Sequence, residues 1–129
     1  MTTVLLVDDE KLVLRSLEKS LLRAGFEVLT AADCQAGWET FQANRQAVEM
    51  VIFDLNMPGF EGTPKPDAGL DLLQKVVEAR PGLPAIILTA YDEVGKAREA
   101  LDVGASAFFV KGREQGLVEL IQAILGKFG

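Results

Sequence analysis

The chain has 129 residues, which fits one domain, and 49% of them are hydrophobic, enough to bury a core without disulfides or metal. Its net charge of −6, with no run of Lys and Arg, argues against direct nucleic-acid binding by this domain. It contains no histidine, which excludes Ser-His-Asp and Cys-His catalysis, and its single cysteine excludes an internal disulfide.

The N-terminal residues show no targeting or membrane segment. They carry no basic leader, and the apolar run Val4–Val7 is too short for a signal peptide or a membrane span. No other stretch is long enough to cross a bilayer. We therefore expect a cytoplasmic protein without membrane contact, in which Cys34 is a small buried filler rather than a reactive thiol.

Five short apolar runs are spaced along the chain. They are continuous rather than alternating, which is typical of parallel strands covered on both faces. The second run is weaker than the others. The predicted strands are Val4–Val7, Val28–Ala31, Met50–Phe53, Ala85–Leu88 and Ala107–Val110.

Amphipathic stretches follow the strands and predict five helices. Asp33 is placed to cap the second helix, while Gly25 and Gly104 are placed to end the first and the fourth. The apolar faces are Leu14, Leu17 and Leu21; Ala36, Trp38 and Phe41; Leu70, Leu73, Val76 and Val77; Val94, Ala97 and Leu101; and Leu117, Ile121, Ile124 and Phe128.

Strict alternation of strand and helix predicts an α/β fold. We expect a doubly wound, five-stranded parallel sheet with flavodoxin-like strand order 2-1-3-4-5 and helices on both faces, formed by residues 1–129 as one domain. Such sheets bind ligands at the carboxyl ends of their strands, which makes the residues at those ends the first candidates for a site.

Polar side chains stand at four of these strand ends. Asp8 and Asp9 follow the first strand, Asp54 the third, Thr89 the fourth and Lys111 the fifth. Each has an ordinary explanation alone, such as a helix cap for Asp9. Together they converge on one edge, where three carboxylates require a proton or a cation, and Mg²⁺ is the hard ion that suits oxygen ligands. A lysine and a hydroxyl facing that cation suit the oxygens of an incoming phosphoryl group.

These residues resemble the receiver domain of two-component response regulators over essentially the whole chain. Four motifs carry the resemblance in the family's order. They are the acidic pair Asp8-Asp9, the segment Asp54-Leu55-Asn56-Met57-Pro58-Gly59, the pair Thr89-Ala90, and the last strand Gly104-Ala105-Ser106-Ala107-Phe108-Phe109-Val110-Lys111.

The resemblance implies a phosphoacceptor switch rather than an enzyme. Asp54 would take a phosphoryl group from a phosphohistidine on a histidine kinase or a phosphotransfer protein. Mg²⁺ would be bound by Asp9, Asp54 and the backbone carbonyl of Asn56, with Asp8 acting directly or through water. The only reactions of the chain itself would be Mg²⁺-dependent self-phosphorylation and slow autodephosphorylation.

The resemblance also assigns roles around the phosphoryl group. Lys111 and the Thr89 hydroxyl would bind its oxygens, and Thr89 would couple to Phe108, which is either the switch aromatic or simply part of the core. Asn56 and Tyr91 would tune how long the phosphate survives.

Two features depart from the family pattern. Gly112 stands where the family usually has proline, and a trans peptide bond is the default there. The loop Gly59–Gly69 is longer than the common pattern, and its prolines and glycines argue against a helix. That loop either shapes kinase recognition and partly covers the site, or it is a tolerated surface insertion.

Several alternatives stay open. A receiver-like interaction module could work without phosphorylation, although the intact set of site residues argues against it. A phosphatase of the haloacid dehalogenase type would need an acid where Asn56 stands, and a dinucleotide-binding domain would need a glycine-rich motif after the first strand. The chain is either a complete regulator with a downstream protein target or the receiver of a longer protein with an output domain. A phosphorylation-dependent homodimer, with Val118 and Leu125 as a contact pair, is also open.

Overall fold

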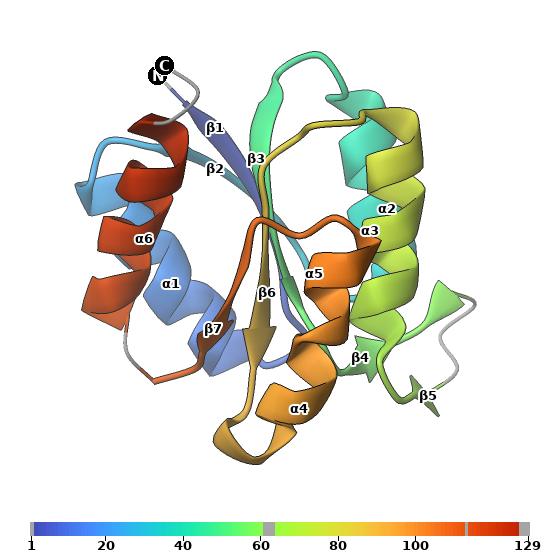
Figure 1. Cartoon of the computed structure of the whole chain (residues 1–129). Helices are drawn as coiled ribbons and strands as arrows, with labels where there is room; N and C mark the ends of the chain where they lie inside the picture. The colour runs from blue at the N-terminus through green and yellow to red at the C-terminus, as the bar shows by residue number, and fades with distance from the viewer. Residues whose placement is uncertain (1, 61–63, 113, 127–129) are drawn as a thin grey trace.

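The computed structural model describes residues 2–60, 64–112 and 114–126, and its centre is a five-stranded parallel sheet (Figure 1). The strands lie in the order β2-β1-β3-β6-β7. Counted without β4 and β5, which lie outside this sheet, this is the predicted order 2-1-3-4-5, so the predicted fold class is confirmed. The strands are β1 (Thr3–Val7), β2 (Glu27–Ala31), β3 (Val48–Asp54), β6 (Ala85–Thr89) and β7 (Ala107–Val110).

The burial of each strand explains its sequence. All residues of β1 and β6 are buried, as are all but one of β3, because these three strands lie inside the sheet. The edge strands β2 and β7 are mostly half-exposed or exposed. A continuous apolar run is therefore required only in the three inner strands, which accounts for the weak signal of β2.

Helices cover both faces of the sheet (Figure 1). One face carries α1 (Lys11–Arg23) and α6 (Glu114–Gly126), and the other carries α2 (Cys34–Ala43), α3 (Ala68–Ala79) and α5 (Glu99–Val103). Each layer encloses its own apolar cluster against the sheet. Burial on two faces stabilises the sheet and holds its strand ends in fixed positions.

The predicted helix signals are largely confirmed. Asp33 caps α2, since its Oδ1 accepts a hydrogen bond from the Ala36 N–H at 2.7 Å. The first helix ends just before Gly25, and α5 ends just before Gly104. The predicted core residue Phe128 lies outside the described residues.

The fourth predicted helix is broken into shorter pieces. The 3₁₀ helix η2 (Tyr91–Glu93) leads into α4 (Val94–Ala97), and α5 follows after Arg98. The break arises because the Leu101 N–H bonds to the Arg98 carbonyl three residues back, at 3.1 Å, and so tightens the turn.

The long loop after β3 contains a small hairpin that the sequence did not predict. Strands β4 (Met57–Pro58) and β5 (Pro64–Lys65) pair antiparallel outside the main sheet. The prediction that Gly59–Gly69 contains no helix was wrong at both ends of this range, because Phe60 is in a 3₁₀ conformation and α3 already begins at Ala68.

Two further expectations concern the backbone and membranes. Among the described residues no peptide bond is cis, which includes the bond between Lys111 and Gly112. In the same residues, no helix has the length and apolar character needed to span a membrane.

Candidate phosphoacceptor site

The predicted site residues stand at the carboxyl edge of the sheet. Asp8 follows β1, Asp54 ends β3, Thr89 ends β6, and Lys111 follows β7. Because β1, β3, β6 and β7 are consecutive neighbours in a parallel sheet, their carboxyl ends lie side by side. The topology therefore brings together residues that are up to 103 positions apart in the chain (111 − 8).

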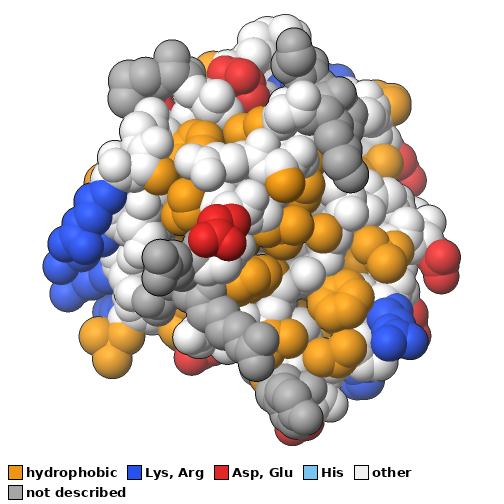
Figure 2. All heavy atoms as spheres, turned by 60° about the vertical axis from the view of Figure 1, so that its left-hand side comes forward, with side chains coloured by type: hydrophobic (Ala, Val, Ile, Leu, Met, Phe, Trp, Pro, Cys, Tyr) orange, Lys and Arg blue, Asp and Glu red, His pale blue; other side chains and the backbone are white. Residues whose placement is uncertain are grey.

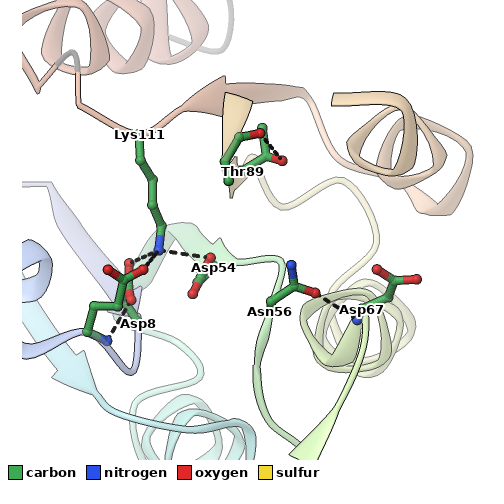
Figure 3. Close-up of polar contacts among 8 residues, drawn as sticks. Asp8, Asp54, Asn56, Asp67, Thr89 and Lys111 are labelled. Carbon is green, nitrogen blue, oxygen red and sulfur yellow. Dashed lines mark hydrogen bonds and ion pairs between the residues drawn. The ribbon is translucent and has the colours of Figure 1, made fainter. Parts of the chain in front are cut away.

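Lys111 makes the central contacts of the site (Figure 3). Its Nζ lies 3.1 Å from Asp8 Oδ2, 3.1 Å from Asp54 Oδ1 and 2.6 Å from Glu10 Oε1. The Glu10 backbone N–H also donates to Asp8 Oδ1 at 2.9 Å. One ammonium thus bridges three carboxylates that would otherwise repel one another.

Burial and mutual repulsion raise the proton affinity of the two inner carboxylates. Asp8 is fully buried and Asp54 is 4% exposed. Burial, together with the charge of Asp8, raises the pKa of Asp54 to about 7 despite the opposing effect of Lys111. Burial likewise raises the pKa of Asp8 above its usual value. The charged form of both carboxylates is therefore costly in this site, and a cation bound beside them would stabilise it.

Lys111 stays charged in this environment. Burial lowers the pKa of its ammonium, but the hydrogen bond with Glu10 and the charges of Asp54 and Asp8 outweigh that effect, so the pKa lies above its usual value. A permanent positive charge is thereby held beside the carboxylate of Asp54.

The donor set fits a hard divalent cation. Carboxylate oxygens of Asp8, Glu10 and Asp54 lie within 4.8 Å of one another. Asp8 Oδ2 is buried and makes no hydrogen bond, although the Lys111 ammonium is close to it. An all-oxygen donor set suits Mg²⁺, which prefers oxygen ligands and retains water.

The predicted ligand Asp9 lies differently from its two acidic neighbours. Its side chain is exposed and lines a cavity of about 610 Å³ beside the site, and its charge contributes to the raised pKa of Asp54. Asn56, whose carbonyl is the predicted backbone ligand, lines the same cavity. The cavity is lined by Asp9, Asn56, Met57, Pro58, Lys65, Pro66, Glu93 and Lys96.

The remaining predicted residues lie around this centre. Thr89 is fully buried, and its hydroxyl donates to the Ala90 carbonyl at 3.2 Å. Phe108 is half-buried on β7 and packs against the apolar cluster under α3. Tyr91 begins η2, but its side chain lies outside the part of the chain that the structure describes.

Three functional positions were missed by the sequence reasoning. Glu10 pairs with Lys111, and its position directly after the acidic pair was the available signal. Asp67 donates its backbone N–H to Asn56 at 3.1 Å. Gly69 packs against the backbone of Asp54 so closely that an added Cβ would lie 2.1 Å from the Asp54 carbonyl oxygen. Nothing in the sequence pattern signals these last two contacts.

Comparison with known proteins identifies the class to which this fold and site belong. The chain matches the response regulator receiver domain over residues 4–124. It therefore belongs to that family, the receiver domains of two-component signalling.

Individual relatives support the same assignment. The chain is 34% identical to response regulator protein FleR of Pseudomonas aeruginosa over 92% of its length and 23% of FleR. It is 32% identical to sensory transduction protein RegX3 of Mycobacterium tuberculosis over its full length and 53% of RegX3. The chain thus spans only about a quarter to a half of these curated relatives.

A solved structure shows the fold match directly. A response regulator receiver domain protein from Clostridium thermocellum superposes with a TM-score of 0.87, at 28% identity, covering 98% of this chain and 96% of that one.

Proposed function

We propose that Asp54 is the phosphoacceptor of this receiver domain and that residues 1–129 form a single domain. The observation that carries the proposal is the contact of the Lys111 ammonium, 3.1 Å from the buried Asp54 carboxylate, within a cluster of acidic oxygens. A buried nucleophile beside a fixed positive charge is the arrangement that transfer of an anionic phosphoryl group requires.

The acceptor reaction follows from this geometry. An oxygen of the Asp54 carboxylate attacks phosphorus, and the bond from phosphorus to the donor's imidazole nitrogen breaks, its electron pair returning to the imidazole. The product is an aspartyl phosphate. A phosphohistidine on a histidine kinase or a phosphotransfer protein is the proposed donor, since receiver domains interact with histidine kinases.

Mg²⁺ would be held by Asp9, Asp54 and the Asn56 carbonyl, with Asp8 acting directly or through water and Glu10 beside them. When bound, it supplies neutralisation of the charge on the phosphoryl oxygens. The cluster that supports this assignment contains Asp8, Glu10 and Asp54.

Lys111 and Thr89 would act on the transferred group. Lys111 must leave at least one of its three carboxylate partners to pair with a phosphoryl oxygen. The Thr89 hydroxyl, which bonds to its neighbour Ala90, would reach the same group by changing to another staggered χ1 rotamer. Movement of Thr89 would make room for Phe108 and so change the surface around β7.

That surface is a candidate for the output of the switch. In Figure 2, hydrophobic side chains gather on the face formed by α6, β7 and α5. All four residues of β7 are half-exposed, Val118 of α6 is half-buried, and Leu101 of α5 is 45% exposed. We assign to this face the contact with an output domain, a downstream protein or a second phosphorylated copy.

Substitution of the acceptor tests the proposal. Asp54→Asn removes the nucleophile with little change of shape, and we expect it to abolish labelling by acetyl phosphate in the presence of Mg²⁺. Asp102→Asn, which changes an exposed acid of α5, is the matched control and should be labelled like the wild type. Undiminished labelling of Asp54→Asn would refute the assignment.

A further inference from the structure

The junction between the long loop and α3 contacts the acceptor segment twice. Asp67, the residue before α3, has a positive φ of 61°, the only such value outside glycine among the described residues. Its backbone N–H donates to Asn56 Oδ1 at 3.1 Å. Two positions further on, the Gly69 N–H donates to the Leu55 carbonyl at 2.9 Å. Two hydrogen bonds therefore join the end of the loop to Leu55 and Asn56, the two residues that follow Asp54.

The first of these contacts determines how the Asn56 amide is oriented. Because a backbone N–H can only donate, the amide oxygen must face Asp67. The amide nitrogen points away from Asp67 (Figure 3). Asn56 is exposed and lines the cavity beside the site, so it offers that cavity N–H donors while its acceptor is engaged with the loop.

The side chain of Asp67 makes a weaker contact than its backbone does. Its Oδ1 lies 3.8 Å from the Lys96 ammonium of α4 and is buried without a hydrogen bond. At this distance and with an exposed lysine the pair contributes little, whereas the left-handed backbone of Asp67 sets the direction of its N–H. Asp and Asn tolerate that conformation better than other side chains.

We propose that Asp67 is a positioning residue that lengthens the lifetime of the aspartyl phosphate by holding the Asn56 amide oxygen away from the acceptor. The inference rests on the proposed function, in which Asp54 carries the phosphoryl group. Under this inference, the end of the long loop Gly59–Gly69 contributes to the phosphoacceptor site and is not only a tolerated surface insertion.

The chemistry of hydrolysis explains the effect. A water oxygen attacks phosphorus, the bond from phosphorus to the Asp54 oxygen breaks, and its electron pair returns to the carboxylate, while one water proton passes to the released phosphate. A hydrogen-bond acceptor beside the attacking water orients it for attack. The clamped Asn56 presents only donors there, whereas a released amide can turn its oxygen toward the water.

Two substitutions of Asp67 form the first test. Asp67→Ala opposes the positive φ and should release Asn56, so we expect the aspartyl phosphate to decay about three- to tenfold faster, the worth of roughly one hydrogen bond. Asp67→Asn keeps both the backbone N–H and the tolerance of this conformation, and it should decay like the wild type. The decay is measured with Mg²⁺ present, on phosphate-affinity gels, after acetyl phosphate is removed.

A double-mutant cycle separates positioning from a general loss of structure. In an Asn56→Ala background, Asp67→Ala should no longer change the decay rate, although it should still lower the free energy of unfolding. Equal acceleration in both backgrounds, or decay of Asp67→Ala at the wild-type rate, would overturn the inference. A wild-type chain that takes no label overturns the proposed function and this inference with it. If the wild-type chain is phosphorylated but the aspartyl phosphate decays at the same rate in every variant, only this inference is overturned.

Discussion

At the scale of single residues, the site is governed by crowding of charge. Asp8 and Asp54 are buried within a few ångströms of each other, and Lys111 offsets only part of the cost of burying their charges. The arrangement is a compromise, because the pKa of Asp54 still rises to about 7. A proton, the lysine ammonium and a metal ion therefore compete for the same carboxylate near neutral pH.

The raised pKa predicts a dependence of stability on pH. The folded-state pKa of Asp54 lies above the unfolded value of 3.8, so the folded state binds more protons between those values. Its contribution to the free energy of unfolding is present below about pH 4 and is lost as the pH rises through about 7. Asp54→Asn mimics the protonated form, and we expect it to be more stable than the metal-free wild type at pH 8, by on the order of 2 kcal/mol.

Denaturant titrations of both chains at pH 5 and pH 8 check this, with EDTA and then with Mg²⁺. The advantage of Asp54→Asn should shrink at pH 5, and it should shrink at pH 8 once Mg²⁺ binds the wild type. An advantage independent of both pH and Mg²⁺ would contradict the prediction.

At the scale of elements, the start of α3 and the end of β3 behave as one unit. The backbone of Gly69 approaches the Asp54 carbonyl so closely that no side chain fits between them. Strand β3 supplies Asp54, and the start of α3 packs against the backbone of that residue. A helix packed at this distance transmits any shift of the loop directly to the acceptor.

Gly69→Ala tests this close packing. The added methyl group would lie 2.1 Å from the Asp54 carbonyl oxygen, so either α3 or the end of β3 must move. We expect the free energy of unfolding to fall by about 2 kcal/mol or more and Mg²⁺ affinity to fall with it. Gly95→Ala is the matched control, because a Cβ at Gly95 in α4 meets nothing within 4 Å. That control should leave stability equal or up to about 1 kcal/mol higher. Equal behaviour of the two variants would count against the packing argument.

At the scale of the whole molecule, two layers of helices leave both edge strands of the sheet partly exposed, and β7 is the apolar one next to the site. The half-exposed strand β7 lies at its edge of the sheet between α5 and α6. This is the surface to which we assign the output of the switch, and its apolar residues distinguish it from the acidic site at the carboxyl end of the sheet.

Self-association through this surface has a direct test. If phosphorylated copies pair here, sedimentation velocity should show a dimer with acetyl phosphate and Mg²⁺, and Leu101→Asp should weaken it about tenfold or more, because a charge would be buried in an apolar contact. Leu12→Asp replaces an even more exposed leucine of α1, 81% exposed, and should leave the dimer intact. A phosphorylated chain that stays monomeric would leave the surface to an output domain or another protein.

The sequence predicted more of the fold than of the site's fine structure, for a physical reason. Inner strands must be apolar on both faces, so β1, β3 and β6 have a strong sequence signal, and the order of these strands with β7 places Asp8, Asp54 and Lys111 together. The two-residue strands β4 and β5 are too short for any periodicity. The contacts of Asp67 and Gly69 depend on where the loop returns in space, which local patterns do not encode.

Cys34, the one cysteine of the chain, provides a way to measure how stably the first turn of α3 packs near Asp54, and no added label is needed. Cys34 is fully buried, its thiol donates to the carbonyl of Ala68, the first residue of α3, at 3.4 Å, and burial raises its pKa to about 12. A disulfide reagent can react with it only when α2 and the first turn of α3 separate. The rate of thiol modification then measures the free energy of that local opening. Because there is a single thiol, the signal reports on this turn alone, and its slowing on addition of Mg²⁺ or acetyl phosphate would show how far ordering of the acceptor spreads into α3.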